Sequence, residues 1–508
     1  MGNGEAAIVT DTGATVSSTS HGGKRRGIGW FSSGRCVCWS VSIPNVQSPW
    51  QVPAAAKLLG SKTHAGCEDT IVTRILSGLG GTCPFGGAAM NDQLRTGLVT
   101  LFLLTSGIQA ADWPQWRGPA RDGKSGETGL LKRWPESGPN RVRTVSGLGE
   151  GYASQVIAGG RVVTIGKDGA VVFARCFSET DGKLLWSTRI GETGRKALST
   201  PTIDGDRVYA LDPDGHLHCL TVADGSVVWK RSFVEEFGGK LQNGRGFAES
   251  PLVDGDSLVG TPGGDKNTMV LLDKTTGKTK WSCEVGAFGP RGRIGAGFSS
   301  PVAVTVGKIR MYIQFIGRGV IGVRASDGKL MWGYNKIAIP QANIPTPVVV
   351  GASVFTSNGY NCGSALLNLT RDGQGGVAMT EEYHLRGREF QNHHGGFVHV
   401  DGHIYGGHGS NNGLPTCIEM KTGDVLWKRR GPGSGSAAVI SAEGRLYMRY
   451  SNGVVALVDA SPEGYRLGGS FRLPGVGNDS WSHPSLANGR LYLRENDSLH
   501  VYDVRQKK

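Results

Sequence analysis

An all-β fold of the β-propeller class is predicted by three features of this sequence. Glycine accounts for 81 of the 508 residues, about twice its average share, and it supplies the positive φ angles of tight turns. A strand–turn–strand phrase and a Gly-x-x-x-Trp phrase each recur about every 40 to 50 residues. Repeats of that period without a helical pattern are typical of four-stranded propeller blades. We expect eight blades, with seven blades or a split architecture as alternatives because two units are irregular.

The beginning of the chain is expected to lie outside the propeller. Residues 1–89 are rich in Gly, Ser and Thr without a sustained period, so we interpret them as an upstream extension that is disordered or untranslated. Met90 then opens a secretory signal peptide over residues 90–111, in which Arg95 precedes a short apolar run and a small-residue cleavage site. An unusually long leader is the alternative. This pattern predicts an exported protein, in the periplasm or at the cell surface, without a transmembrane anchor after cleavage.

The remaining chain divides into an arm and the propeller. Residues 112–140 hold Trp113, Trp116 and Trp134, and we expect this Trp-rich arm to pack on the ring. Residues 141–508 are assigned to the propeller. Each unit of the propeller begins with two strands joined by a turn, and these openings are residues 153–165, 199–211, 249–260, 299–313, 344–357, 395–407, 435–449 and 482–494.

Five units contain a tryptophan four residues after a glycine. The Asp-Gly or Thr-Gly pair makes a tight turn, and the residues after it form the outer strand of the blade. A tryptophan is large enough to cover the apolar face between neighbouring sheets. We therefore predict a blade-packing role for Trp186, Trp229, Trp281, Trp332 and Trp427. A degenerate copy of the phrase places Tyr383 near the position expected for a sixth member.

The last unit indicates how the ring closes. From Ser482 onward the chain holds only three strands and no Gly-x-x-x-Trp phrase. Residues 141–149, which precede the first unit, can supply the missing outer strand. Joining the ends in this way removes open sheet edges.

Charge and cysteine content exclude several classes of function. The net charge is +13, but the basic residues are scattered in pairs and triples without a basic run or helix, so no nucleic-acid partner is expected. After the leader, the cysteines are widely spaced and form no CxxC or CxxCH motif for zinc or covalent haem. We interpret them as small buried strand residues; they are Cys176, Cys219, Cys283, Cys362 and Cys417.

The most defensible binding site lies at one mouth of the central channel. In a propeller, the loops that enter the innermost strands converge on that mouth, which is a concave place for a ligand. The candidate ligand-binding residues on these loops are Arg245, Glu249, Arg291, Arg293, Asn343, Gln391, Asn392, His393, His394, Trp481 and His483. The same loops carry Tyr152, Arg195 and Lys196.

The stretch EFQNHHGGFVHVDG raises the question of a metal site. The sixth unit holds His393, His394, His399, His403 and His408, five of the twelve histidines. Two adjacent histidines on a strand point to opposite faces and cannot both bind one metal. On an irregular loop, one could face a ligand while the other packs sideways. A metal reading and a structural reading both stay open, and no confident metal ligand is assigned.

The repeats carry a family resemblance. The strand-Gly-x-x-x-Trp endings, with DWPQWRGPARDG, ANIPTPVVV, FQNHHGG and WSHPSLANGRLYLREND, resemble the pyrroloquinoline-quinone (PQQ) repeats of quinoprotein alcohol dehydrogenase-like propellers, in particular a secreted bacterial subgroup. The resemblance covers about residues 112–508. It implies a propeller. Some members of the subgroup carry the names polyvinyl-alcohol dehydrogenase or outer-membrane assembly factor.

Two functions are implied, and the sequence favours the first. The chain is either a monomeric exported binding or scaffolding propeller, with a protein or polymer partner at the cell envelope, or a PQQ- and calcium-dependent alcohol or sugar dehydrogenase. In the second case Glu249 and Asn343 are the calcium candidates, and Arg245, Arg291 and Arg293 would hold the quinone carboxylates. The adjacent cysteines and haem motif of those dehydrogenases are missing, and no catalytic residue can be assigned.

Overall fold

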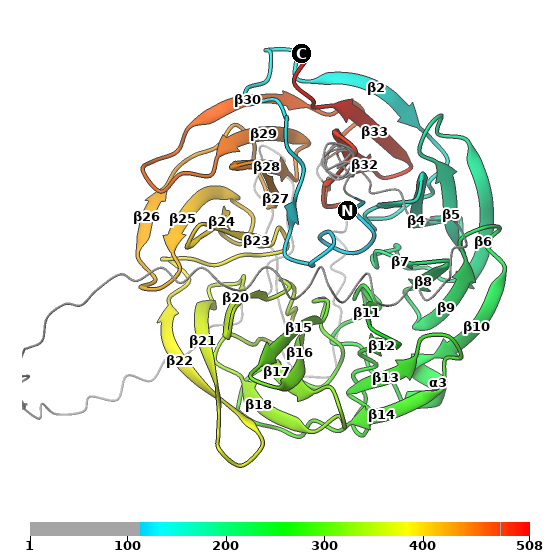
Figure 1. Ribbon diagram of the computed structural model, residues 1–508, viewed down its shortest axis with the longest axis vertical. Coiled ribbons are helices and arrows are strands. Elements are labelled where there is room, and N and C mark those ends of the chain that lie inside the picture. Colours follow the sequence, from blue (N-terminus) through cyan, green and yellow to red (C-terminus); the bar gives the residue numbers. More distant parts are fainter. Residues whose placement is uncertain (1–111, 478, 508) are drawn as a thin grey trace, which may run out of the picture. The chain divides into compact units, whose positions relative to one another are not determined.

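The computed structural model describes residues 112–477 and 479–507. The expected upstream extension (1–89) and signal peptide (90–111) lie outside the described residues. The described chain forms eight sheets that are arranged as the blades of a ring (Figure 1). The predicted eight-bladed β-propeller is thereby confirmed.

Blades 1 to 4 follow one another along the chain, and in each the strands run in order from the inside of the ring outward. Blade 1 is β3 (Val156–Ala158), β4 (Arg161–Asp168), β5 (Val171–Ser178) and β6 (Leu184–Glu192). Blade 2 is β7 (Thr202–Asp204), β8 (Arg207–Leu211), β9 (His216–Thr221) and β10 (Val227–Ser232). Blade 3 is β11 (Leu252–Asp254), β12 (Ser257–Gly260), β13 (Met269–Asp273) and β14 (Thr279–Cys283). Blade 4 is β15 (Val302–Val306), β16 (Ile309–Ile316), β17 (Gly319–Arg324) and β18 (Leu330–Tyr334).

Blades 5 to 7 repeat this order, and blade 8 departs from it. Blade 5 is β19 (Val348–Val350), β20 (Ser353–Asn358), β21 (Gly363–Arg371) and β22 (Val377–Leu385). Blade 6 is β23 (Phe397–Val400), β24 (His403–His408), β25 (Leu414–Glu419) and β26 (Val425–Lys428). Blade 7 is β27 (Ala437–Ala442), β28 (Arg445–Tyr450), β29 (Val454–Asp459) and β30 (Leu467–Arg472). Blade 8 contains β31 (Ser485–Ala487), β32 (Arg490–Glu495) and β33 (Ser498–Asp503).

The outer strand of blade 8 comes from the other end of the propeller sequence. Strand β2 (Asn140–Val145) pairs antiparallel with β33, with Asn140 opposite Asp503 and Val145 opposite Leu499. Val145 and Leu499 both belong to the buried apolar cluster of this part of the ring. The predicted closure by an N-terminal strand is confirmed, and it leaves blade 8 without an unpaired outer edge on β33.

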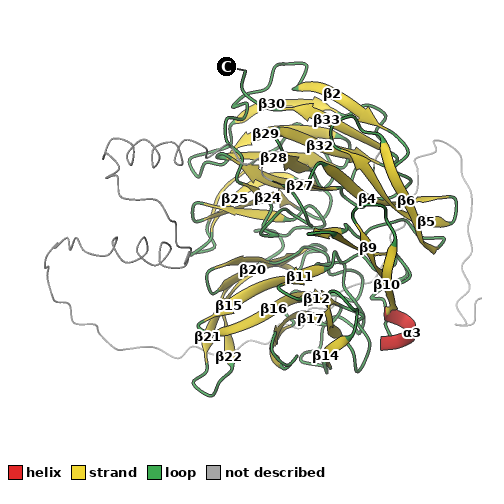
Figure 2. Cartoon of the chain, turned by 45° about the vertical axis from the view of Figure 1, so that its right-hand side comes forward, coloured by secondary structure: helices red, strands yellow, loops and turns green. Residues whose placement is uncertain are grey.

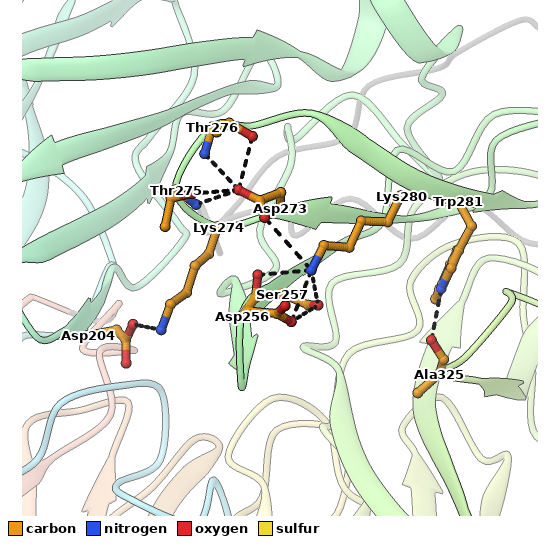
Figure 3. A network of polar contacts seen from close by, with 10 residues as sticks. All are labelled: Asp204, Asp256, Ser257, Asp273, Lys274, Thr275, Thr276, Lys280, Trp281 and Ala325. Carbon is orange, nitrogen blue, oxygen red and sulfur yellow. Dashed lines mark hydrogen bonds and ion pairs between the residues drawn. The ribbon is translucent and has the colours of Figure 1, made fainter.

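The repeated glycine and tryptophan form one docking contact between successive blades. Gly225 has a φ of +75°, and a Cβ atom there would lie 2.6 Å from the ring of Trp186 in the preceding blade. The indole Nε1 of Trp186 donates to the carbonyl oxygen of Val222 at 2.9 Å. Trp229 and Trp281 dock on the following blades in the same way, and the Trp281 bond to Ala325 is drawn in Figure 3.

Tyr383 takes this docking position in blade 5. Its hydroxyl donates to the carbonyl oxygen of Met420 at 2.8 Å, and its ring lies against Gly423 of blade 6. Trp427 then donates to the carbonyl oxygen of Ser461 in blade 7. The Gly-x-x-x-Trp phrase therefore serves two contacts, since its glycine receives one ring and its tryptophan covers the next blade.

The N-terminal arm lies across the middle of the ring, in cyan in Figure 1. Its short strand β1 (Lys124–Ser125) pairs parallel with the innermost strand β27. Trp113 exchanges backbone hydrogen bonds with Ile157 of blade 1, and Trp113 and Trp134 are buried in the same apolar cluster. The arm thus packs inside the ring as well as against it.

A single short helix occurs among the described residues, α3 (Phe233–Phe237), shown in red in Figure 2. Its N-cap Ser232 accepts a hydrogen bond from the backbone N–H of Glu235 at 3.1 Å, which satisfies a backbone donor at the start of the helix. Phe233 and Phe237 point into the core between blades 2 and 3. The helix follows the outer strand β10, and its Phe233 packs against Phe247 of the loop that enters β11, at 5.5 Å between ring centroids.

Candidate functional site

The loops at the channel mouth are joined from blade to blade by hydroxyl side chains. The backbone N–H of Ser154 donates to Thr200 Oγ1, that of Thr200 to Ser250 Oγ, and that of Ser250 to Ser300 Oγ, at 2.9 to 3.1 Å. Ser300 continues to Thr346 at 3.3 Å. These residues stand at the same place in successive units, two residues before the inner strand begins. We call this set the hydroxyl belt (Ser154, Thr200, Ser250, Ser300 and Thr346).

A cavity of about 730 Å³ lies inside the ring of these loops. Its lining holds four cationic side chains, namely Arg117, Arg195, Lys196 and Arg245, and no carboxylate. Arg195 forms an ion pair with Asp214 outside the lining. Arg245 and Lys196 are exposed and have no ion pair within the described part of the chain. The cavity is therefore suited to an anionic ligand and unsuited to a free cation.

Aromatic rings form a second wall of the cavity. His393 lies 5.0 Å from Tyr360 and 4.5 Å from His394 between ring centroids, and His394 lies 4.8 Å from Trp481. Trp481 in turn lies 4.8 Å from Tyr152. The histidines come from the loop that enters blade 6, whereas Lys196 comes from the loop that enters blade 2, four blades away in the ring. A flat or apolar group would find contacts on this wall while an anionic group faced the cations.

Burial keeps the mouth histidines neutral. Desolvation, followed by the charge of Arg245, lowers the pKa of His393 to about 4, and desolvation also lowers the pKa of His394 well below its usual value. The pKa of His483 falls to about 3 because of burial and the nearby Arg117. His393 Nε2 hydrogen-bonds to the Tyr360 hydroxyl at 2.9 Å. Near neutral pH these rings act as uncharged aromatic surface.

Five of the eleven candidate residues line this cavity. They are Arg245, His393, His394, Trp481 and His483, and they are joined there by Tyr152, Arg195 and Lys196 from the same loops. The other six do not line it. Arg291 and Arg293 are exposed in the loop before blade 4. Gln391 accepts hydrogen bonds from Asn361 N and Ser410 Oγ, so it fixes the neighbouring loops.

The three remaining candidates are buried and already satisfied by the protein. Glu249 accepts from the backbone N–H of Thr261 at 2.6 Å and from Gln314 Nε2 at 3.1 Å. Burial raises the pKa of its carboxyl group to about 7. Asn343 and Asn392 each use both ends of the side-chain amide on surrounding loops. Their polar atoms hold the mouth in shape.

These contacts decide against the calcium assignment at Glu249 and Asn343. Calcium takes six to eight oxygen ligands, usually with several carboxylates. The Glu249 oxygens face amide donors, the Asn343 oxygen accepts from Ile339 N and Asn358 Nδ2, and the cavity lining holds no carboxylate. Within residues 112–477 and 479–507, no group of three or more His, Cys, Asp or Glu could hold a metal ion. The residues present do not fit a calcium-bound quinone.

The histidines of blade 6 do not gather into one cluster. His399 and His403 flank the β23–β24 turn, where His403 Nδ1 lies 2.7 Å from the carbonyl oxygen of Asp401. His408 lies beside Lys428, on the side of the blade that faces Phe390. Only His393 and His394 reach the cavity. A structural role within the blade accounts for His399, His403 and His408.

Among the cavity residues that sequence reasoning missed are Trp116, Arg117 and Tyr360. Trp116 and Arg117 belong to the arm, which was expected to pack on the ring but carries no repeat that would place it at the channel mouth. Tyr360 lies in the hairpin between β20 and β21, not in a loop that enters an inner strand. The signal available for the first two was their place in the tryptophan-rich stretch DWPQWRGPARDG.

Comparison with known proteins gives the family and the fold. A family model described as outer membrane protein assembly factor BamB matches residues 127–234 and 170–429. No curated protein matches the chain. Among the described residues, no helix is long and apolar enough to cross a membrane.

Solved structures share the propeller at low identity. BamB from Moraxella catarrhalis is 14% identical, with a TM-score of 0.51, over 72% of this chain and 98% of that chain. The quinohemoprotein alcohol dehydrogenase from Comamonas testosteroni is 11% identical, with a TM-score of 0.55, over 80% and 82%. A europium-containing methanol dehydrogenase is 11% identical, with a TM-score of 0.55, over 75% and 89%. At these identities the likeness concerns the fold alone.

Proposed function

Because the chain belongs to the family described as outer membrane protein assembly factor BamB, we propose that it is an exported binding propeller of the cell envelope. The channel mouth holds an anionic ligand with a flat or apolar body. The outer surfaces of the blades are left for a protein or polymer partner. No step of chemistry is assigned to the site.

One observation carries this proposal. The cavity is lined by four cationic side chains and by the aromatic wall, without a carboxylate. Arg245 and Lys196 have no ion pair among the described residues, and the Lys196 ammonium lies over the Tyr152 ring at 4.9 Å. The neutral histidines add surface for stacking without adding charge. Such a lining supports binding of a carboxylate or phosphate that is joined to a ring system.

The alternative is a PQQ- and calcium-dependent alcohol or sugar dehydrogenase. The likeness of fold to a quinohemoprotein alcohol dehydrogenase and a methanol dehydrogenase favours it. Against it stand the satisfied Glu249 and Asn343 and the cationic lining, which would repel a calcium ion beside the quinone. We therefore give it second place.

Titration of the full chain with PQQ, a flat aromatic tricarboxylate, distinguishes the binding function from the dehydrogenase function. We expect binding that is equal with calcium and with a chelator. Arg245→Gln should weaken it by about two- to fivefold, the size of one partly solvated charge contact. Arg293→Gln makes the same chemical change outside the cavity and should leave the affinity unchanged.

Two outcomes would contradict the binding proposal. Binding only in the presence of calcium, together with oxidation of alcohols or sugars by an artificial electron acceptor, would establish the dehydrogenase. Equal weakening by Arg245→Gln and Arg293→Gln would mean that net charge alone attracts the quinone and that the cavity is not its site.

A further inference from the structure

Two residues of the N-terminal arm line the cavity. Trp116 Nε1 donates to Thr346 Oγ1 of the hydroxyl belt at 3.0 Å, and the Trp116 ring lies 4.5 Å from that of His483. The next residue, Arg117, is 3% exposed and lines the cavity as well. A segment from outside the repeats therefore supplies two side chains of the site.

The hydroxyl belt ends at blade 5, and Arg117 lies at the corresponding position of blade 6. The residue that corresponds to Ser250 and Thr346 in this blade is Gly396. A Cβ atom at Gly396 would collide with Arg117 Nη1. The absence of a side chain at Gly396 thus leaves the space that the guanidinium group occupies beside the cavity.

The guanidinium group of Arg117 is only partly used by the protein. Its Nη2 donates to the carbonyl oxygens of Phe397 and Asp122, while Nε and Nη1 are buried without a hydrogen-bond partner among the described residues. The Asp122 carboxylate is engaged by Lys124 at 3.1 Å. Burial lowers the pKa of Arg117 to about 10, so the group remains a cation near neutral pH. A buried cation with unused donors is costly unless an anion reaches it.

We propose that Arg117 is the oxyanion subsite of the cavity and receives a carboxylate or phosphate group of the ligand, whose ring body lies against Trp116 and Trp481. The arm is then a part of the binding site. This inference rests on the proposed function and extends it, because it says where in the cavity the anionic group binds and which segment supplies its partner.

A naphthalene series tests the subsite by calorimetry on the full chain. The probes are 2-naphthoate, 2-naphthyl phosphate and uncharged methyl 2-naphthoate, which share one ring system. We expect the two anions to bind and the ester to bind at least about tenfold more weakly, as suits a charge-assisted hydrogen bond in a buried place. The stronger of the two anions identifies the group that the subsite prefers.

Substitutions in the arm test whether Arg117 is the residue that binds the anionic group. Arg117→Gln should weaken binding of the preferred anion by about tenfold or more and leave the ester unchanged. Arg121→Gln is the matched control, since Arg121 is an equally buried arginine of the arm that donates to the carbonyl oxygens of Ser250 and Pro251 and does not line the cavity. If Arg117→Gln does not fold, Arg117→Lys, which keeps the charge and shortens the reach, should still weaken the anion selectively.

The possible results separate the two proposals. Anion binding that is weakened by Arg245→Gln but unaffected by Arg117→Gln and Arg117→Lys would overturn the subsite and leave the binding function standing. Equal losses in Arg117→Gln and Arg121→Gln would also overturn it, because the arm would then act only on the shape of the ring. If neither anion binds the unaltered chain, both proposals fail.

Discussion

Burial lowers the pKa of the histidines at the channel mouth more than the charges of neighbouring residues do. His483 is 6% exposed, donates through Nε2 to the His394 carbonyl oxygen at 3.0 Å, and its ring lies tilted against that of Trp116. Because a carbonyl oxygen only accepts, Nε2 carries the proton and Nδ1 is left as an acceptor. Protonation would place a cation beside Arg117, and the cavity lining holds no carboxylate to offset it.

This predicts a pH dependence of stability that is due to His483. The folded-state pKa is about 3, below the ordinary value of 6.5, so its contribution to stability is complete above pH 6.5 and is lost as the pH falls toward 3. Between about pH 7.5 and pH 5 the free energy of unfolding should fall by about 2 kcal/mol from this residue. Urea unfolding of His483→Gln at both pH values should show a drop smaller by that amount. An unchanged drop would contradict the assignment.

The site residues divide by how they could be found. Arg245, His393, His394, Trp481 and His483 were predictable because the repeat places their loops at one mouth. Glu249, Asn343 and Asn392 stand in the same loops, but their side chains turn inward and hold the backbone. Which way a polar side chain turns depends on partners in other blades, and a single sequence does not carry that information.

At the scale of elements, the outer strands depart from the simple alternating pattern. In β10 the residues Val227 and Trp229 pair with Leu220 and Cys219, so that Val228 is an extra residue in a β-bulge. Val227 and Val228 are 50% and 41% exposed, while the tryptophan packs on the next blade. From the sequence alone, the apolar residues before each tryptophan would be expected to be buried. The bulge explains why some of them are exposed.

The docking of a tryptophan on a turn glycine predicts a specific loss of stability. Gly225→Ala should destabilise the protein by about 1 kcal/mol or more beyond Gly205→Ala, because an added methyl group meets the Trp186 ring. Gly205 is the matched control, since it has a φ of +57° in the same blade but open space where an added Cβ would lie. Urea unfolding measures both. Equal effects would show that backbone strain alone acts and that the docking contact contributes nothing.

At the scale of the whole molecule, the two ends of the propeller are bound into one ring. Strand β2 completes blade 8, and the backbone N–H of His483 donates to Ser154 Oγ of blade 1 at 2.8 Å. The arm adds contacts to seven of the eight blades, from Trp113 on blade 1 to Ser125 on blade 8. A closed ring of this kind should unfold as one cooperative unit.

Weakening the closure should therefore destabilise every blade together. Val145→Asp places a carboxylate in the buried cluster between β2 and β33 and should lower the free energy of unfolding by at least about 2 kcal/mol. Far-ultraviolet circular dichroism and tryptophan fluorescence should report the same shifted midpoint. Two separate transitions would mean that blade 8 opens alone and that the closure does not couple the ring.

The amino-acid sequence determined the propeller, the number of its blades and the strand that closes it, because these follow from local turns, strand periods and the count of repeats. The tertiary structure alone decided what the channel mouth is. Its cationic and neutral aromatic walls come from residues in distant blades, and two of its side chains, Trp116 and Arg117, come from an arm without any repeat. Contacts such as that between Arg117 and Gly396 depend on how far-apart segments meet in space, which no period along the chain records.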